Sequence, residues 1–241
     1  MFGLFNRRSS LTEAGLFTGA IDNHSHILYG LDDGVKTWEE SSDIMTWMEE
    51  LGLSEVWFTP HVMEDVPNTT EGLKARYAEF LSRYKGGLKT NLAAEYMLDG
   101  LFTQRLEAGD LLTHGGALVL VETSTVAPPI GLWDILESMM CKGFRPLVAH
   151  PERYRYMSRA DYDRLQQMGC KMQLNLPSIA GYYGSSAQER AKMLLRKGYY
   201  DLVGSDCHRF KAVERQYAAK ELDKETIKLL RPLMDAVAEE I

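Results

Sequence analysis

The chain contains little cysteine: three residues in 241, with no C-x-x-C pair among them. Disulfide frameworks and thiolate zinc sites need cysteines in characteristic spacings, so the sequence favours neither, and a reducing cytoplasm is expected. Hydrolysis of phosphate through a cysteine thiolate is also excluded, because it needs a C-x5-R loop. The residues six positions after the three cysteines are Leu147, Leu176 and Val213.

Long apolar runs and an excess of basic residues are also missing. No run approaches the roughly 18–20 residues that span a bilayer, and the first residues lack the apolar region and cleavage site of a signal peptide. At most a peripheral membrane contact is expected, through Phe2–Phe5 and the Arg7-Arg8 pair, but a loosely packed tail over residues 1–17 is favoured. The net charge of −7 argues against a general nucleic-acid binder, since affinity for the phosphate backbone comes from clustered Lys and Arg.

No repeat, low-complexity tract or Pro-rich linker divides the chain, so one domain over residues 18–241 is predicted. Short β-type segments alternate with helical ones, which indicates parallel strands joined by right-handed crossovers. The seven β-type segments are 18–24, 54–61, 88–95, 117–123, 145–150, 170–175 and 201–206. Together with a helical pair near 213–220 and 225–240, they suit a closed or nearly closed α/β barrel. A doubly wound open sheet is the alternative.

Local patterns mark several helix boundaries. Three Ser or Thr residues have capping-box spacing to an acidic residue three positions later: Thr37, Ser158 and Ser186. Three glycines follow predicted helix ends, where a left-handed C-cap favours glycine: Gly52, Gly169 and Gly198.

Side chains of metal-binding type stand at the carboxyl ends of six of the seven predicted strands. The nine candidates are His24, His26, Asp33, His61, Glu95, Glu122, His150, Asp206 and His208. In a barrel these ends converge on the face that holds the active site, whereas an open sheet would spread them along a crevice. The pattern therefore favours the barrel. Without a cation, carboxylates gathered in this way could not all stay ionised.

The donor types indicate which metal such a site would bind. Five imidazoles and four carboxylates without sulfur suit Mn²⁺, Fe²⁺ or Zn²⁺ in a reactive site better than a structural zinc site. Nine donors exceed the needs of one ion and suffice for two or three. Three dications with four carboxylates would leave a charge of about +2, which attracts a phosphate or a hydroxide.

Two arginines lie close in sequence to these candidates. Arg153 follows His150 by three residues, and Arg209 follows His208 directly. Guanidinium groups suit phosphate oxygens, so both are candidate phosphate contacts, with salt bridges at the rim as the alternative. His114, in a turn before the fourth strand, is predicted to be structural.

With these residues assembled, the chain resembles the polymerase-and-histidinol-phosphatase superfamily, and within it the bacterial protein-tyrosine phosphatases associated with capsular and exopolysaccharide synthesis. The resemblance is carried by IDNHSHIL (21–28), DDG (32–34), TPH (59–61), AE (94–95), VE (121–122), AHPERY (149–154) and SDCH (205–208). It implies a distorted (β/α)7 barrel with three metal ions, often Mn²⁺, bound by the nine candidates, and a phosphate contact from Arg153. It also implies hydrolysis of phosphotyrosine, typically on the tyrosine-rich tail of a kinase that faces the cytoplasm.

The mechanism we expect is in-line attack on phosphorus by a hydroxide that the metals activate, with Asp206 or His208 as general acid or base. Two departures concern the substrate contacts. Glu64 and Asp65 follow His61 where some relatives carry basic residues, and Val213 stands near the place expected for a second phosphate-binding arginine.

Three other functions remain as alternatives. The first is a small-molecule phosphomonoesterase such as a histidinol phosphatase. The second is a metal-dependent amidohydrolase, which commonly uses a carboxylated lysine where this chain has Glu122. The third is a non-catalytic, metal-stabilised regulatory module.

Four tyrosines are candidates for lining an aromatic groove, with packing as the equal alternative: Tyr154, Tyr156, Tyr182 and Tyr183. A homo-oligomer is left open.

Overall fold

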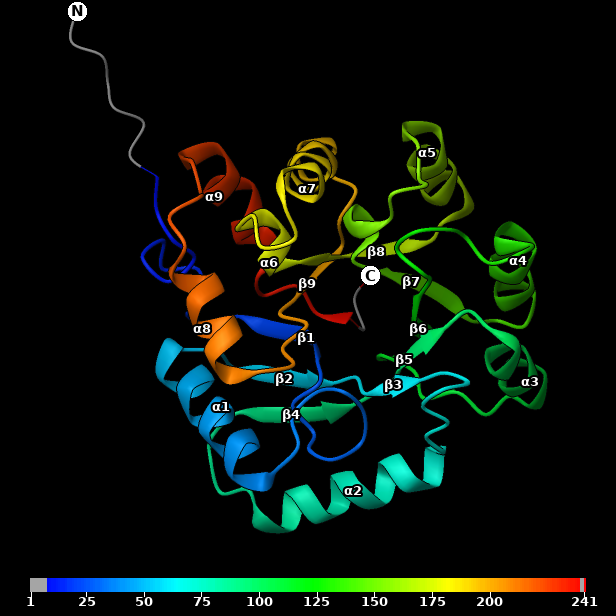
Figure 1. The fold of residues 1–241 in the computed structure, drawn as a ribbon, viewed down its shortest axis with the longest axis horizontal. Helices are drawn as coiled ribbons and strands as arrows, with labels where there is room; N and C mark the ends of the chain where they lie inside the picture. The colour runs from blue at the N-terminus through cyan, green and yellow to red at the C-terminus, as the bar shows by residue number, and fades with distance from the viewer. Residues whose placement is uncertain (1–7, 239–240) are drawn as a thin grey trace, which may run out of the picture.

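The structure, a computed structural model, describes residues 8–238 and residue 241. In these residues nine strands form two parallel sheets at the centre of the molecule (Figure 1). One sheet has the order β1 (Ile21–Ser25), β2 (Glu55–Phe58) and β4 (Lys89–Leu92). The other has the order β3 (His61–Val62), β5 (Glu95–Met97), β6 (Leu118–Glu122), β7 (Arg145–Ala149), β8 (Lys171–Asn175) and β9 (Leu202–Gly204). The predicted parallel pairing is confirmed.

Two of the seven predicted strands are each divided in the structure. Segment 54–61 becomes β2 and β3, and segment 88–95 becomes β4 and β5. Pro60, between β2 and β3, has no N–H to donate to a neighbouring strand and so interrupts the ladder. Hydrogen bonding continues past the break, since the Ala93 N–H donates to the Phe58 carbonyl at 2.8 Å. The two sheets therefore continue into each other on this side.

On the other side, β1 meets β9 at a short seam. Ser25 forms a single parallel bridge with Cys207. The buried carboxylate of Asp22 accepts hydrogen bonds from the backbone N–H of Ser205 at 2.7 Å and from its hydroxyl at 2.6 Å. Burial raises the pKa of Asp22 to about 6, although these hydrogen bonds oppose the shift. The parallel sheet is thus curled, and its two edges are held together by both side-chain and backbone hydrogen bonds.

Helices cover the outside of the curled sheets (Figure 1). They are α1 (Trp38–Leu51), α2 (Thr70–Arg83), α3 (Gly100–Ala108), α4 (Leu132–Cys141), α5 (Arg159–Met168), α6 (Leu176–Ile179), α7 (Ser185–Lys197), α8 (Phe210–Ala218) and α9 (Lys224–Leu230), with 3-10 turns η1 (Pro151–Arg153) and η2 (Arg231–Leu233). The last predicted helix, 225–240, is wrong in its length. It ends at Leu230, and Pro232 follows within a 3-10 turn.

Most of the predicted helix boundaries are confirmed. The Thr37 hydroxyl accepts from the Glu40 N–H at the start of α1, and Ser158 forms a complete capping box with Asp161 at the start of α5. The three C-cap glycines all have a left-handed backbone: Gly52, Gly169 and Gly198. Ser186 is not a cap, because α7 begins one residue earlier, after Gly184.

Alternation along the strands separates an interior face from a helix-covered face. Leu118 and Leu120 of β6 lie in a small interior cluster with Leu147 and Ala149 of β7. The intervening Val119 belongs to the larger core that the helices cover. Because side chains in a strand alternate, Glu122 shares the interior face with Leu120 and lies at the carboxyl end of the strand. The same period of two places polar strand ends inside the curl.

The segment 8–17 differs from the loose tail that was predicted. Ser9 forms an antiparallel bridge with Leu222, Leu11 is fully buried, and Phe17 stacks on Tyr217 with ring centroids 4.7 Å apart. The prediction is wrong for these residues because their apolar side chains complete the core beside α8. Its other part, residues 1–7, lies outside the described residues.

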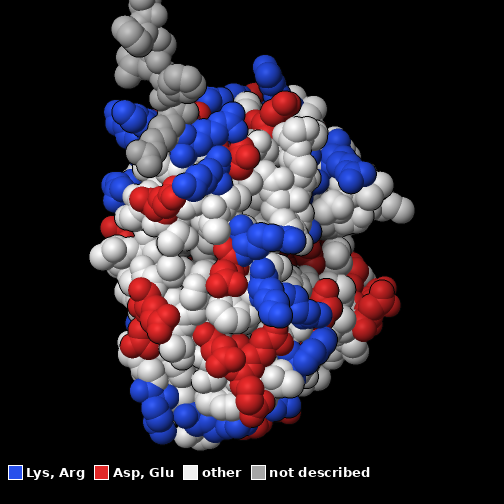
Figure 2. Space-filling view, turned by 60° about the vertical axis from the view of Figure 1, so that its left-hand side comes forward, with Lys and Arg blue, Asp and Glu red and all other residues white. Residues whose placement is uncertain are grey.

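Two surface properties bear on partners. In the described part of the chain, none of the helices combines the length and apolar character needed to cross a membrane. On the face drawn in Figure 2, basic and acidic side chains are interspersed.

Candidate metal centre

The nine predicted ligands form one connected cluster at the carboxyl ends of the strands, with Glu95 at its middle. Oε2 of Glu95 lies 3.2 Å from Nε2 of His24, 3.3 Å from Nε2 of His26 and 3.1 Å from Nδ1 of His61. Its Oε1 lies 3.1 Å from Nε2 of His150. Glu95 has no exposed surface. One buried carboxylate therefore contacts four imidazoles from three different segments of the chain.

Asp206 and His208 close the cluster on the side of β9. Oδ1 of Asp206 lies 3.6 Å from Nε2 of His24 and 3.3 Å from Nδ1 of His208. Nε2 of His208 lies 3.4 Å from the carboxylate of Asp33, whose side chain is 73% exposed. The cluster thus extends from a buried centre to an open rim.

Within the cluster, three groups of side chains bring one donor atom each within 4.8 Å of the others, close enough to share an ion. They are His26, His61 and His208; His24, His26 and Asp206; and His61, Glu95 and Glu122. The predicted convergence of the strand ends is confirmed. The role of the nine residues as metal ligands stays a prediction.

The orientation of the two histidines of β1 fits metal binding. Nδ1 of His24 lies 2.9 Å from Oε1 of Gln173, and Nδ1 of His26 lies 2.8 Å from Oδ2 of Asp32. Both partners are acceptors, so Nδ1 of each ring carries the hydrogen, and Nε2 of each neutral ring presents a lone pair. The two Nε2 atoms face each other at 3.1 Å. Two lone pairs at this distance repel, so a proton or a metal ion must lie between them, and divalent metal ions bind imidazoles held in this way.

Unpaired atoms in the cluster give the same indication. Oε2 of Glu95 and Nδ1 of His61 are buried and lie 3.1 Å apart, but neither has a hydrogen bond of good geometry to another described residue. A buried polar atom without a partner costs about 1–3 kcal/mol, and in native folds a bound ion is one of its usual partners. The donor set therefore fits divalent cations.

The electrostatics of the cluster demand positive charge at its centre. Burial alone would lower the pKa of His24, but the Glu95 and Asp206 carboxylates raise it to about 9. Burial likewise opposes the protonation of His61, yet Glu122 and Glu95 raise the pKa of His61 to about 12. The pKa of Glu95 lies well below its usual range, because the histidines around it outweigh the effect of burial. A bound metal that replaces protons on the imidazoles satisfies the same demand.

Three buried polar residues that orient the candidate ligands were not predicted. Asp32 holds His26 and also accepts from the His61 N–H at 2.9 Å. Gln173 holds His24, and Nδ2 of Asn175 donates to Oδ2 of Asp206 at 2.8 Å. Gln173 and Asn175 lie on β8, the strand for which no ligand was predicted. Two polar residues at alternate positions of a buried strand were the available signal.

The two predicted phosphate arginines lie in different surroundings. Nη1 of Arg153 lies 2.8 Å from Oδ2 of Asp206, and its guanidinium lies 4.4 Å above the ring of Tyr183. Arg209 is exposed and donates to the carbonyl oxygens of Gly34 and His208. Arg153 is therefore placed at the centre, whereas Arg209 is held by backbone carbonyls at the rim.

Two candidate ligands have a left-handed backbone. Among the described residues, His150 (φ 34°) and Asp206 (φ 51°) are the only non-glycine residues with positive φ. Leu147 and Ala149 face the interior, so simple alternation would turn His150 outward. The left-handed turn brings its ring back toward Glu95. Such a backbone costs on the order of 1–3 kcal/mol for each residue and is concentrated at functional sites.

His114 lies outside the cluster, as predicted. Its Nε2 donates to the Asn23 carbonyl at 2.7 Å, and its ring stacks on Trp57 at a centroid distance of 4.1 Å. Burial lowers the pKa of His114 to about 4.

We expect His114 to make the protein less stable as the pH falls from 6.5 to 4. In this window the unfolded His114, with its ordinary pKa of 6.5, is protonated while the folded side chain stays neutral. The unfolded state then binds more protons, so the free energy of unfolding falls with pH. A shift of this size corresponds to about 3 kcal/mol over the whole window. Urea unfolding at pH 7.5 and 4.5, with chelator present, should show a smaller loss for His114→Gln than for the wild type. Equal losses would contradict this account.

The comparisons with known proteins agree with this geometry. The sequence profile of the family described as "Capsular polysaccharide synthesis, CpsB/CapC" matches residues 20–228. The chain belongs to this family. All nine candidate ligands, from His24 to His208, lie within the region that matches the CpsB/CapC family.

Among curated relatives, "Tyrosine-protein phosphatase CpsB" of Streptococcus pneumoniae is 28% identical over 202 residues, which cover 78% of this chain and 82% of that protein. "Tyrosine-protein phosphatase YwqE" of Bacillus subtilis is 25% identical over 214 residues, 85% of this chain and 84% of that protein. A solved structure described under "YwqE from Bacillus subtilis and CpsB from Streptococcus pneumoniae, unique metal-dependent tyrosine phosphatases" has a TM-score of 0.75 at 23% identity, covering 90% of this chain and 88% of that chain. The CpsB/CapC chain described here shares that fold.

Proposed function

We propose that the chain is a metal-dependent protein-tyrosine phosphatase. The observation that carries the proposal is the cluster around Glu95, where five imidazoles and four carboxylates converge with lone pairs facing one another. Membership of the CpsB/CapC family supports it, because relatives of this chain are named tyrosine-protein phosphatases.

The proposed cofactor is two or three divalent ions per chain, Mn²⁺ first, with Fe²⁺ and Zn²⁺ as alternatives. The proposed ligands are the nine residues of the cluster, held in place by Asp32, Gln173 and Asn175. When bound, such ions supply positive charge to the phosphate oxygens and make a water acidic enough to serve as the nucleophile.

The protein itself would hold the phosphate and supply a proton. Arg153 is already fixed beside the centre by Asp206 and can turn one N–H toward a phosphate oxygen. Oδ2 of Asp206 accepts from Arg153, Asn175 and Tyr183, so Asp206 is a poor proton donor. His208 is the better candidate at the half-exposed rim, in a state where its Nε2 is not bound to a metal. A departing phenolate, with a pKa of about 10, needs little help.

A cavity over the centre suits an aromatic substrate. It has a volume of about 290 Å³, and its lining includes Asp33, Tyr182, Tyr183, Asp206, His208 and Arg209. Tyr182 is 47% exposed and stands edge-on to Tyr183, with ring centroids 5.0 Å apart. Aromatic walls of this kind pack well against a phenyl ring. Tyr154 is instead fully buried, and Tyr156 is bonded to Thr123, so neither of these two lines this cavity.

We expect kcat/KM for a phosphotyrosyl peptide to exceed that for histidinol phosphate by roughly tenfold or more, because the open cavity with its aromatic walls can contact more of the peptide. Initial rates with both substrates on the Mn²⁺-loaded protein provide the measurement. A preference of about a hundredfold for histidinol phosphate would replace this function with a small-molecule phosphatase.

The physiological substrate we propose is a phosphotyrosine protein, specifically the tyrosine-rich tail of a bacterial tyrosine kinase that controls capsular or exopolysaccharide synthesis, with the reaction in the cytoplasm. The family description supports the link to capsule synthesis. We further propose that the two sheets form one distorted (β/α)7 barrel within a single domain that comprises the predicted residues 18–241 and the packed segment 8–17. The continuity of β2 with β3 and the seam between Asp22 and Ser205 support this count.

A further inference from the structure

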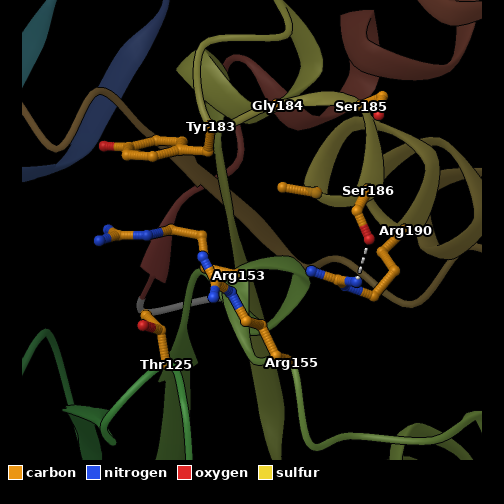
Figure 3. Close-up of a pocket in the computed structure, with 9 residues that line it drawn as sticks. Thr125, Arg153, Arg155, Tyr183, Gly184, Ser185, Ser186 and Arg190 are labelled. Carbon is orange, nitrogen blue, oxygen red and sulfur yellow. Dashed lines mark hydrogen bonds between the residues drawn. The ribbon is translucent and has the colours of Figure 1, made fainter.

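A second, larger cavity adjoins the metal centre. Its volume is about 550 Å³, and its lining includes Thr125, Arg153, Arg155, Tyr183, Ser186 and Arg190. Figure 3 shows the three arginine side chains around this space, beneath the segment that carries Tyr183 and Gly184. They come from different parts of the fold: Arg153 from η1, Arg155 from the loop after it and Arg190 from α7. None of the described residues that line the cavity carries a carboxylate.

Two of these arginines are not neutralised. Within the described part of the chain, neither Arg155 nor Arg190 forms a salt bridge, whereas Arg153 pairs with Asp206. Arg190 is fixed in place by neutral acceptors, since its Nε donates to the Glu152 carbonyl at 2.7 Å and its Nη1 to the Ser186 hydroxyl at 2.8 Å. In a chain with a net charge of −7, this is a concentration of uncompensated positive charge beside the site of reaction.

The amino end of α7 adds to this charge. The helix has 13 residues, and Gly184 precedes it without a side-chain cap. Gly184 and the first three residues of the helix line the cavity. Their N–H groups carry the partial positive charge of a helix amino end, which favours anions.

The two cavities are neighbours. Tyr183 lines both, and its hydroxyl lies 3.3 Å from Oδ2 of Asp206. Arg153 reaches from the lining of the larger cavity to the same oxygen at 2.8 Å. An extended peptide advances about 3.3–3.6 Å per residue. A side chain within a few residues of a phosphotyrosine at the metal centre can therefore enter the larger cavity.

We propose that this cavity is a second anion subsite, which binds an acidic or phosphorylated side chain that flanks the phosphotyrosine in the substrate. The inference rests on the proposed phosphatase function and adds a substrate class: phosphotyrosines in clusters of negative charge. Guanidinium groups bind carboxylate and phosphate oxygens through paired N–H groups, so the same site accepts either anion.

The test compares phosphotyrosyl peptides that differ in one residue, placed one to three positions from the phosphotyrosine on either side. The residue is alanine, lysine, glutamate, or phosphonomethyl-phenylalanine, which carries the charge of phosphotyrosine and is not hydrolysed. For the Mn²⁺-loaded wild type we expect kcat/KM to be about fivefold higher with glutamate than with alanine, the effect of one partly exposed charge pair, and higher again with the dianion. The peptide with lysine should be the poorest substrate. Equal values for all four peptides at every position would overturn the proposal.

Substitutions at Arg155 test whether the preference for an acidic neighbour arises in this cavity. The Arg155 side chain forms no hydrogen bond or salt bridge with another described residue, so Arg155→Gln should lower the glutamate-to-alanine ratio toward one, and Arg155→Glu should invert it. Arg196→Gln is the matched control, because Arg196 lies on α7 outside the cavity and pairs with Glu225 at the surface. An unchanged ratio in both Arg155 variants would also overturn the subsite. A different result would contradict the proposed phosphatase function itself: the wild type with Mn²⁺ would hydrolyse none of the peptides.

Discussion

Removing divalent cations with a chelator is expected to lower turnover of a phosphotyrosyl peptide by about a thousandfold or more, and added Mn²⁺ is expected to restore it. The nucleophile and the charge that stabilises the transition state both depend on the ions. The fold itself should survive, because the protonated imidazoles of His24 and His61 can replace the metal charge beside the carboxylates. Metal at about a hundred times its dissociation constant should add about 2.7 kcal/mol to the free energy of unfolding.

The measurements are initial rates and thermal unfolding before and after chelation, with metal content determined on the same samples. Chelator saturated with Mn²⁺ beforehand serves as the control. Full turnover by protein shown to be metal-free would refute the mechanism.

The second large effect is expected for Glu95→Gln. The amide keeps the shape of the carboxylate but removes the charge that contacts four imidazoles, so the variant should bind fewer ions and lose on the order of a thousandfold in kcat/KM. Metal content and kcat/KM of the purified variant are the measurements.

Glu55→Gln is the matched control for this change. Glu55 is also a nearly buried carboxylate, but it lies at the start of β2, where it accepts from the indole N–H of Trp57 at 2.9 Å. Its replacement should leave turnover close to the wild-type value. A folded Glu95→Gln variant with normal metal content and turnover would show that this cluster is not the reaction centre. A folded variant without turnover would count against a non-catalytic module, as would the same result for His24→Ala.

Much of this arrangement follows from the period of two in strands and from the direction of parallel pairing. The residues that end each strand on the interior face must meet, which is why Glu95 and Glu122 both reach His61. His150 is out of phase with this alternation and joins them only through its left-handed backbone, which the sequence did not predict. The helix starts at Thr37 and Ser158 were predictable for a similar reason, since a capping box depends only on residues close in sequence.

The features that the sequence did not predict depend on positions where two neighbouring residues fit the local pattern equally well. Asp32 and Asp33 are adjacent carboxylates in one turn, but Asp32 turns inward to hold His26 while Asp33 faces the rim. Ser185 and Ser186 are adjacent serines, and the local pattern does not show which of them begins the helix. In the structure the Ser186 hydroxyl accepts a hydrogen bond from Arg190, four residues further along the same helix. Two predicted strands are divided in the structure because of Pro60 and because the sheet curls. The composition of the strand segments does not predict that curl.

The left-handed backbones of His150 and Asp206 mean that the stability of the fold and the activity of the site favour different residues at these two positions. A glycine at either position would relax the chain locally and remove a candidate ligand in the same step. Variants selected for heat resistance alone, without an assay for turnover, would therefore accumulate changes at these two positions early. Such variants would unfold at a higher temperature than their parent, but they would have lost candidate ligands at the carboxyl ends of the strands.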